Sequence, residues 1–296
     1  MIDFTNCKEL LSTYGGSEKK KKILYNNKNY LVKFPDPVRE GGNSLSYMNN
    51  QYSEYIGCHI LESLGIKTQN TILGKYNDNG KQKIVVACED FTSASDELIE
   101  FSKLANSVTK IDNKFTCRIE DVYSVINNTD FIKNKTVILE KFWDLFVADA
   151  LIGNPDRHLD NWGLLYNIKN ETYSFSPVYD CGSCLHALIS EEKKNQLLKN
   201  KSEMKNVAYN IKSAYSINGK RIFYSEFLKN PPLDLKKAIL RIAPKINMDL
   251  INKIIDETAT ISEVDKLFFK ESIKIRKELI IDAAYKKIAN DYKNNI

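Results

Sequence analysis

The chain has 296 residues, of which 43% are hydrophobic, and its formal net charge is +5. A chain of this length can bury one large core or two modest ones, because the buried share of the surface rises with chain length. The charge is too small and too dispersed to indicate a nucleic-acid surface, so nucleic acid is not expected as a direct partner. These figures fit a two-lobed enzyme and leave the oligomeric state open.

The sequence carries no signal for a membrane span or for standard secretion. No apolar run approaches the roughly 20 residues that cross a bilayer. The segment from Met1 to Leu11 lacks the basic and then apolar pattern of a secretory signal. We therefore expect a protein that is cytoplasmic as made, and any later secretion or translocation would not use a standard signal peptide.

Six cysteines at irregular spacing do not resemble a disulfide framework. Cys181 and Cys184 form a C-x-x-C, but no second pair follows to complete a tetrahedral zinc site. The two residues are either a redox pair or two small buried thiols, and burial is the commoner role of free cysteine.

Short strands and turns dominate the N-terminal part. Residues 23–25 and 30–34 are apolar runs separated by Asn and Lys residues, which predicts a hairpin. Residues 71–76 and 84–88 predict two further strands, with a turn that ends at Gly80. This part of the chain is therefore expected to form a sheet.

One helix interrupts these strands, and longer helices follow them. Over residues 52–64 apolar side chains recur at four-residue intervals, and the glycine that follows is typical of a helix end. After Phe91, residues 137–152 predict the most apolar helix and residues 273–289 a terminal one. The polar stretch 105–135 predicts a helix with loops.

The polar segment 153–163 carries the most chemical information. It reads G-N-P-D-R-H-L-D-N-W-G and directly follows the apolar helix, so its side chains are expected on a loop held by a buried element. Further on, the segment S-P-V-Y-D-C-G places Asp180 before a turn. Asp156, Asn161 and Asp180 thus follow the kinase order of a base, a metal-binding Asn after four intervening residues, and a second metal-binding Asp. Carboxylate and amide oxygens also suit Mg²⁺, a hard cation.

The spacing D-x-x-x-x-N alone is a weak signal, but the longer strings are more specific. N-x-D-R-H-x-x-N-W-G followed by P-x-Y-D-x-G resembles the HipA-like serine/threonine kinases, a bacterial branch of the protein-kinase-like fold, and especially its small single-chain members. The resemblance covers nearly the whole chain. It implies an α+β, two-lobed fold, with a small strand-rich nucleotide-binding lobe over residues 1–88 and a larger, mainly helical catalytic lobe over residues 89–296.

The resemblance implies ATP and Mg²⁺ as cofactors, with Asp156 as the catalytic base and both Asn161 and Asp180 as metal ligands. Lys33 matches the lysine that binds the nucleotide phosphates, and Glu54 matches the helix glutamate that fixes this lysine by an ion pair. Two plainer interpretations stay open. Lys33 would then be an edge-strand lysine facing solvent, and Glu54 a helix-start carboxylate favoured by the helix dipole.

The resemblance gives weaker assignments to two backbone regions. Gly15, Gly16 and Ser17 precede the first hairpin and either cover the phosphates or form an ordinary turn. Main-chain groups of Glu89 and Phe91 would bond adenine at the hinge between the lobes.

Three further polar residues lie in or near the segment that carries the predicted base. His158 is expected to orient Asp156 or the phosphates, and no second His stands at metal-ligand spacing. Asp160 competes with Asp156 as the base, although the spacing to Asn161 favours Asp156. Asp144 is expected to be a structural carboxylate that accepts hydrogen bonds from loop backbone donors.

The leading hypothesis for function is an ATP- and Mg²⁺-dependent serine/threonine protein kinase that phosphorylates itself and another protein. A lipid or small-molecule kinase is the first alternative, because related folds share the same Asp-Asn-Asp apparatus. A nucleotide-binding toxin or scaffold with little turnover is the second. The wider protein-kinase pattern is not fully met, because Cys181 replaces the usual Phe and His158 follows the base; activation-loop control is therefore not expected.

Overall fold

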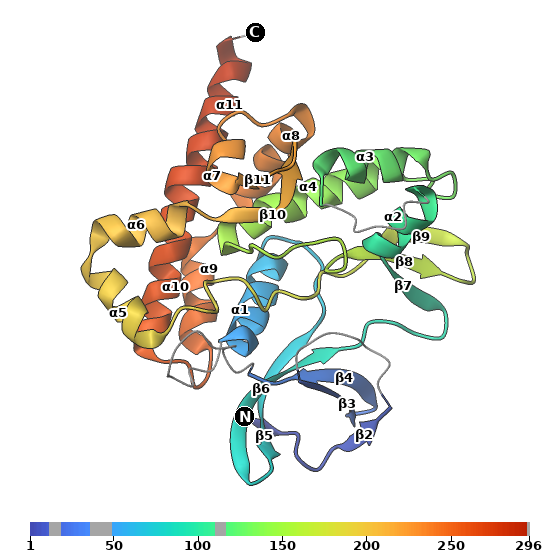
Figure 1. Cartoon of the computed structure of the whole chain (residues 1–296), viewed down its shortest axis with the longest axis vertical. Helices are drawn as coiled ribbons and strands as arrows, with labels where there is room; N and C mark the ends of the chain where they lie inside the picture. Colours follow the sequence, from blue (N-terminus) through green and yellow to red (C-terminus); the bar gives the residue numbers. More distant parts are fainter. Residues whose placement is uncertain (12–18, 36–48, 110–116, 295–296) are drawn as a thin grey trace.

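A computed structural model describes residues 1–11, 19–35, 49–109 and 117–294 of the chain. A small lobe built around a sheet joins a larger lobe that is mainly helical (Figure 1). The predicted α+β class is therefore confirmed. Within the described residues, no helix combines the length and the apolar character that crossing a bilayer requires.

Six strands form the sheet of the small lobe, in the order β1-β5-β6-β4-β3-β2. Both predicted hairpins are present, and their strands are longer than the apolar runs indicated. Asn26 and Asn27 turn the first hairpin with φ angles of 46° and 60°, a left-handed conformation that Asn tolerates. The strands are β1 (Ile2–Asp3), β2 (Lys8–Leu10), β3 (Lys20–Tyr25), β4 (Lys28–Lys33), β5 (Thr71–Asp78) and β6 (Lys81–Glu89).

Helix α1 (Asn50–Ser63) packs against β5 and β6 and connects the small lobe to the large one. Its far side contacts α9 (Met248–Glu257), and its apolar residues belong to the main core of the molecule. A second, smaller core that includes Phe4 and Val32 lies within the small lobe. The predicted helix is thus confirmed, and Gly65 follows it with a φ of 78°.

The large lobe is organised around α4 (Lys135–Ile152), whose residues are all buried from Phe142 onward. Such an all-round apolar helix belongs in a core. It ends at Gly153, which has a left-handed φ of 66°, and the polar segment begins there. The other helices of this lobe are α2 (Phe101–Thr109), α3 (Ile119–Asn128), α5 (Glu191–Lys199), α6 (Lys201–Tyr209), α7 (Tyr224–Phe227), α8 (Leu233–Ile242), α10 (Glu263–Arg276) and α11 (Asp282–Asn294).

The large lobe also contains strands that the sequence analysis did not predict. Strands β7 (Asp96–Glu100), β8 (Gly163–Asn167) and β9 (Thr172–Phe175) form a three-stranded sheet. Strands β10 (Lys212–Ile217) and β11 (Lys220–Phe223) form a hairpin. The terminal helical region begins earlier than predicted, because α10 passes into α11 through a π-helical turn. These short strands border the polar segment and help to position it.

Candidate active site

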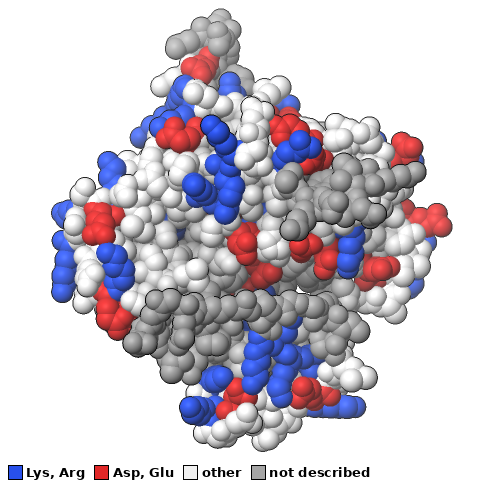
Figure 2. Space-filling model, in the orientation of Figure 1, with Lys and Arg blue, Asp and Glu red and all other residues white. Residues whose placement is uncertain are grey.

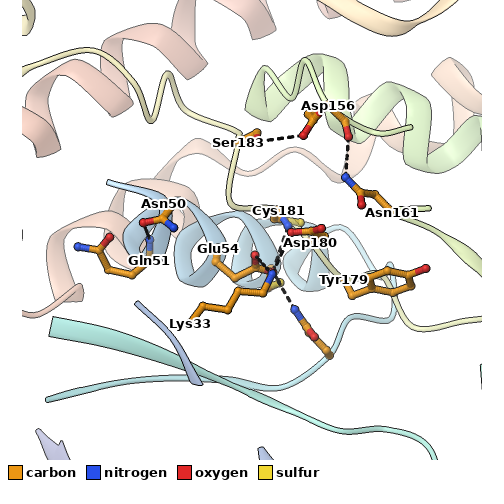
Figure 3. A network of polar contacts seen from close by, with 12 residues as sticks. Lys33, Asn50, Gln51, Glu54, Asp156, Asn161, Tyr179, Asp180, Cys181 and Ser183 are labelled. Atoms are coloured by element: carbon orange, nitrogen blue, oxygen red, sulfur yellow. Dashed lines mark hydrogen bonds and ion pairs between the residues drawn. The ribbon is translucent and has the colours of Figure 1, made fainter. Parts of the chain in front are cut away.

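Lys33 lies at the centre of a buried polar network between the lobes. It is the last residue of β4 and only 9% exposed. Its Nζ donates to Oε2 of Glu54 at 2.9 Å and to Oδ1 of Asp180 at 2.9 Å (Figure 3). Strand β4 pairs with a neighbour on each side, so the interpretation of Lys33 as a solvent-facing edge lysine is wrong. One ammonium group therefore links β4, α1 and the segment after β9.

Glu54 is fully buried and has donors on both carboxylate oxygens. Besides Lys33, it accepts hydrogen bonds from Nε2 of Gln69 at 2.7 Å and from the main-chain N of Cys181 at 3.0 Å. A buried carboxylate is tolerated only when it is paired and hydrogen-bonded. No acidic residue lies in the first turn of α1, so the helix-start interpretation of Glu54 is also wrong.

The charges of this network stabilise one another. Burial acts to lower the pKa of Lys33, but Asp180 and Glu54 outweigh it, and the pKa is raised well above its usual range. The charge of Lys33 lowers the pKa of Asp180. Lys33 and Asp180 are therefore both ionised at neutral pH. Asp180 also has a left-handed φ of 58°, a strained conformation that is common at functional sites.

A second network holds the segment 153–163 in place. Arg157 is buried, and its guanidinium donates to Asp149 of α4, with 3.0 Å between Nε and Oδ2. Its Nη1 donates to the main-chain O of Asn161 at 2.8 Å and to the main-chain O of Asp180 at 3.2 Å. A single side chain thus fastens together the two loops that carry the predicted ligands. The sequence string contains Arg157, but nothing in the string indicates this role.

The structural carboxylate beneath the segment 153–163 is Asp149. The expectation that Asp144 accepts hydrogen bonds from the loop backbone was wrong. Asp149 accepts from Nδ2 of Asn154 at 3.1 Å as well as from Arg157. Asp144 instead accepts from Arg241 of α8, at 3.0 Å and 2.8 Å. Helix α4 contains two aspartates, Asp144 and Asp149, and a glutamate, Glu140, nearer its start, and the sequence alone does not indicate which aspartate lies beneath the loop.

Asp156 projects outward from this scaffold, with 54% of its side chain exposed. Its main-chain N donates to Oδ1 of Asn154 at 3.0 Å, and its Oδ2 accepts from Oγ of Ser183 at 3.3 Å. Nδ2 of Asn161 donates to the main-chain O of Asp156 at 2.8 Å, so Oδ1 is the end of this amide suited to a cation. Figure 3 shows that Asp156, Asn161 and Asp180 gather in one region.

His158 lies between the two exposed carboxylates of the segment. Its Nδ1 accepts from the main-chain N of Asp160 at 3.2 Å, so the neutral ring carries its proton on Nε2. Nε2 is 4.0 Å from Oδ1 of Asp156, and Nδ1 is 3.4 Å from Oδ2 of Asp160. The separation from Asp156 is longer than a hydrogen bond, so an orienting role of His158 stays a prediction, whereas Asp160 lies toward the other ring nitrogen.

The remaining predicted positions are less informative. The main-chain N of Glu89 donates to the O of Asn70 at 2.8 Å, which leaves its carbonyl as the group suited to adenine. The ring of Phe91 lies 6.0 Å from that of Tyr179, a neighbour of Asp180. Gly15, Gly16 and Ser17 lie outside the described residues.

Cys181 and Cys184 are free, fully buried thiols, as the commoner interpretation of the C-x-x-C expects. Cys58 and Cys181 come within 4.8 Å of each other and of a Glu54 carboxylate oxygen. Burial and the neighbouring Cys181 raise the pKa of Cys58 well above its usual range, with Cys181 as the larger cause. Glu54 is already neutralised by Lys33. The hard oxygen donors of Asn161 and Asp180 stay the predicted cation site, because they suit a hard cation better than thiols do.

Comparison with known proteins places this site in a family. The chain is 40% identical, over 96% of its length and 87% of the relative, to the serine/threonine-protein kinase CtkA of Helicobacter pylori strain J99. It superposes on the crystal structure of the H. pylori proinflammatory kinase CtkA with a TM-score of 0.88 and 38% identity, over 98% of each chain. A Shewanella oneidensis HipA, solved with HipB and operator DNA, shares the fold with a TM-score of 0.57 at 15% identity, over 96% of this chain and 68% of that one.

The identity to a serine/threonine-protein kinase over nearly the whole chain and the shared fold define a kinase. Residues 12–261 match the family described as the HipA-like C-terminal domain. The chain belongs to this HipA-like family.

Proposed function

We propose that the chain transfers the γ-phosphoryl group of ATP, with Mg²⁺, to serine or threonine hydroxyls of proteins, its own chain included. The observation that carries this proposal is the bridge from Lys33 to Glu54 and Asp180, at 2.9 Å on each side. A kinase needs its phosphate-binding lysine and its metal-binding carboxylate beside each other. The relative named a serine/threonine-protein kinase supports the choice of acceptor.

Three side chains would hold the nucleotide phosphates and the metal. Oδ1 of Asn161 and the carboxylate of Asp180 are hard oxygen donors, which fits them to Mg²⁺. Mg²⁺ would neutralise negative charge on the phosphates. Lys33 would release Asp180 and bind phosphate oxygens while Glu54 holds it in position, because Glu54 is fixed by three other donors.

Asp156 would accept the proton of the acceptor hydroxyl. Its carboxylate is exposed and accepts one hydrogen bond from Ser183, so an incoming hydroxyl can reach it. Nε2–H of His158 faces the carboxylate and would keep it oriented. The carbonyl of Glu89 and the main-chain N–H of Phe91 would bind adenine, and residues 15–17 would cover the phosphates.

The test is phosphate transfer from γ-labelled ATP in the presence of Mg²⁺ to the purified chain, to a mixture of generic protein substrates and to lipid vesicles. We expect label on phosphoserine or phosphothreonine of protein. The Asp156→Asn variant should still bind ATP but should place no label on protein. Label on lipid alone would instead indicate a lipid kinase. ATP binding without transfer to any acceptor would contradict the proposal and favour a nucleotide-binding scaffold.

A further inference from the structure

The β10–β11 hairpin is fastened to the main chain just before Asp156. Nη2 of Arg221 donates to the main-chain O of Pro155 at 2.6 Å, and its Nε donates to the main-chain O of Ser213 at 2.8 Å. Oη of Tyr224, at the start of α7, donates to the main-chain O of Asn154 at 2.8 Å. The hairpin therefore has a fixed position beside the predicted base.

Three cations of this hairpin, Lys212, Lys220 and Arg221, are exposed. The ion pairs found among the described residues include none of them. Several lysines of the small lobe differ, because they have carboxylate partners within 3.0 Å. Figure 2 shows Lys and Arg side chains gathered over the hairpin, next to acidic side chains near the junction of the lobes. Arg221 already donates to two main-chain oxygens, and Nζ of Lys212 lies 5.1 Å from the centre of the Phe223 ring. Neither contact neutralises the positive charge, so the three side chains can still attract an acidic ligand.

The segment 153–163 carries negative charge on the side of Asp156 that lies away from the hairpin contact at Pro155. Asp160 has 61% of its side chain exposed. Glu100 pairs in register with Gly163, two residues beyond Asn161, but its carboxylate is 3.0 Å from Nζ of Lys103, so Asp160 carries the negative charge of this side. Positive charge thus lies on the side of residue 155, and negative charge lies on the side of residues 160–163. A protein segment that crosses Asp156 would meet opposite charges at its two ends.

We propose that the hairpin selects protein substrates with an acidic residue close to the phosphorylated serine or threonine. This inference rests on the proposed kinase function. Arg221 contacts the residue before Asp156, and an extended chain advances about 3.3–3.6 Å per residue. The substrate carboxylate would therefore lie about two to three residues from the acceptor. Lys212 and Lys220 would add attraction for further acidic residues, because complementary charge guides encounter and fixes register.

Peptides that differ only in charge test this selection. Each peptide has one acceptor serine in a neutral background, with Glu, Gln or Lys at one position within about four residues on either side. We expect Glu at one or more positions to raise kcat/KM by about fivefold over Gln, and Lys to lower it. Equal kcat/KM for Glu and Gln at every position would overturn the inference.

Variants of the hairpin show whether these cations cause the preference. Lys212→Glu with Lys220→Glu should remove the preference for Glu peptides and favour Lys peptides. Arg221→Gln should lower the ratio of Glu to Gln, whereas an equal loss with every peptide would mean that Arg221 only supports Pro155. Lys237→Glu is the matched control, because Lys237 is exposed on α8 and should not change the ratio.

The outcomes separate this inference from the proposed function. If peptides are phosphorylated but the Glu preference survives all hairpin variants, the inference fails and the kinase assignment stands. The same holds if the chain labels only itself, because the hairpin would then select no external segment. If no protein or peptide is labelled, the proposed function fails and the inference fails with it.

Discussion

Arg157 and Asp149 form a buried ion pair beneath the segment that carries Asp156. Each side chain is at most 2% exposed, and Nε of Arg157 lies 3.0 Å from Oδ2 of Asp149. The same guanidinium holds the main-chain oxygens of Asn161 and Asp180. The relative position of the two predicted metal ligands therefore depends on a pair that touches neither of their side chains.

Asp149→Asn should cost the protein about 3–5 kcal/mol of unfolding free energy, because it leaves the buried charge of Arg157 without a carboxylate. Phosphate transfer should fall as well, since Asn161 and Asp180 lose their common support. Urea unfolding and labelled-ATP assays measure the two effects. Asp144→Asn is the control, because its partner Arg241 is 33% exposed and the pair should contribute only about 1 kcal/mol. Equal losses in the two variants would contradict this account.

Asp156→Asn should lower kcat by about 10²–10⁴-fold, the usual contribution of general acid–base catalysis. The affinity for ATP should stay within about twofold, because no hydrogen bond or ion pair among the described residues joins Asp156 to Lys33, Glu54 or Asp180. Asp160→Asn should have the smaller effect on kcat, because Asp160 faces Nδ1 of His158. Single-turnover labelling together with ATP titration separates kcat from binding. A larger loss of kcat in Asp160→Asn would reassign the base.

Asp180→Asn should remove the dependence of nucleotide affinity on Mg²⁺, because it replaces the only carboxylate of the proposed metal site. The measurement is ATP affinity by calorimetry, with Mg²⁺ and with EDTA. Glu54→Gln is the contrasting variant. It should weaken ATP binding in both conditions and keep the ratio between them, since it releases Lys33 without changing a metal ligand. An unchanged Mg²⁺ dependence in Asp180→Asn would exclude Asp180 from the metal site.

Local patterns in the sequence predicted much of the small lobe. The turns at Asn26–Asn27 and at Asn79–Gly80 require left-handed backbone, which Asn and Gly tolerate, so turn chemistry identified both hairpins. Helix α1 was predictable from its apolar spacing and from Gly65. The strands β7 to β11 were missed, because they have four to six residues and mixed polarity. Strand β7 also pairs with β8, which is distant in the chain. The β10–β11 hairpin did carry a local signal that was overlooked, since Asn218 and Gly219 form its turn with φ angles of 51° and 74°.

The site could be predicted as a set of side chains but not as a network. Asp156, Asn161 and Asp180 were identified from spacing and resemblance, and Lys33 and Glu54 were matched to each other. The support from Arg157 and Asp149 could not be predicted, because both faces of α4 are buried near its end. Without an amphipathic pattern, the sequence does not indicate which carboxylate of that helix faces the loop.

The stability of the protein should fall with acid through His186, which lies in the segment after Asp180. Its Nε2 accepts from Nη1 of Arg276 at 3.2 Å, and burial, followed by the charge of Arg276, lowers its pKa from 6.5 to about 3. Below pH 6.5 the unfolded chain therefore binds a proton that the folded chain does not bind. Stability attributable to His186 is complete above pH 6.5 and decreases as the pH falls toward 3, by at most about 1.4 kcal/mol per pH unit.

His186→Asn tests this linkage, because Asn does not titrate and tolerates the left-handed φ of 57° at this position. Urea unfolding of both proteins between about pH 7 and about pH 5 gives the two slopes of unfolding free energy against pH. The carboxylates and the other histidines contribute equally to both slopes, so the difference isolates His186. The wild-type protein should lose more stability than the variant over this interval. Parallel slopes would mean that His186 takes up its proton as readily in the folded chain as in the unfolded one.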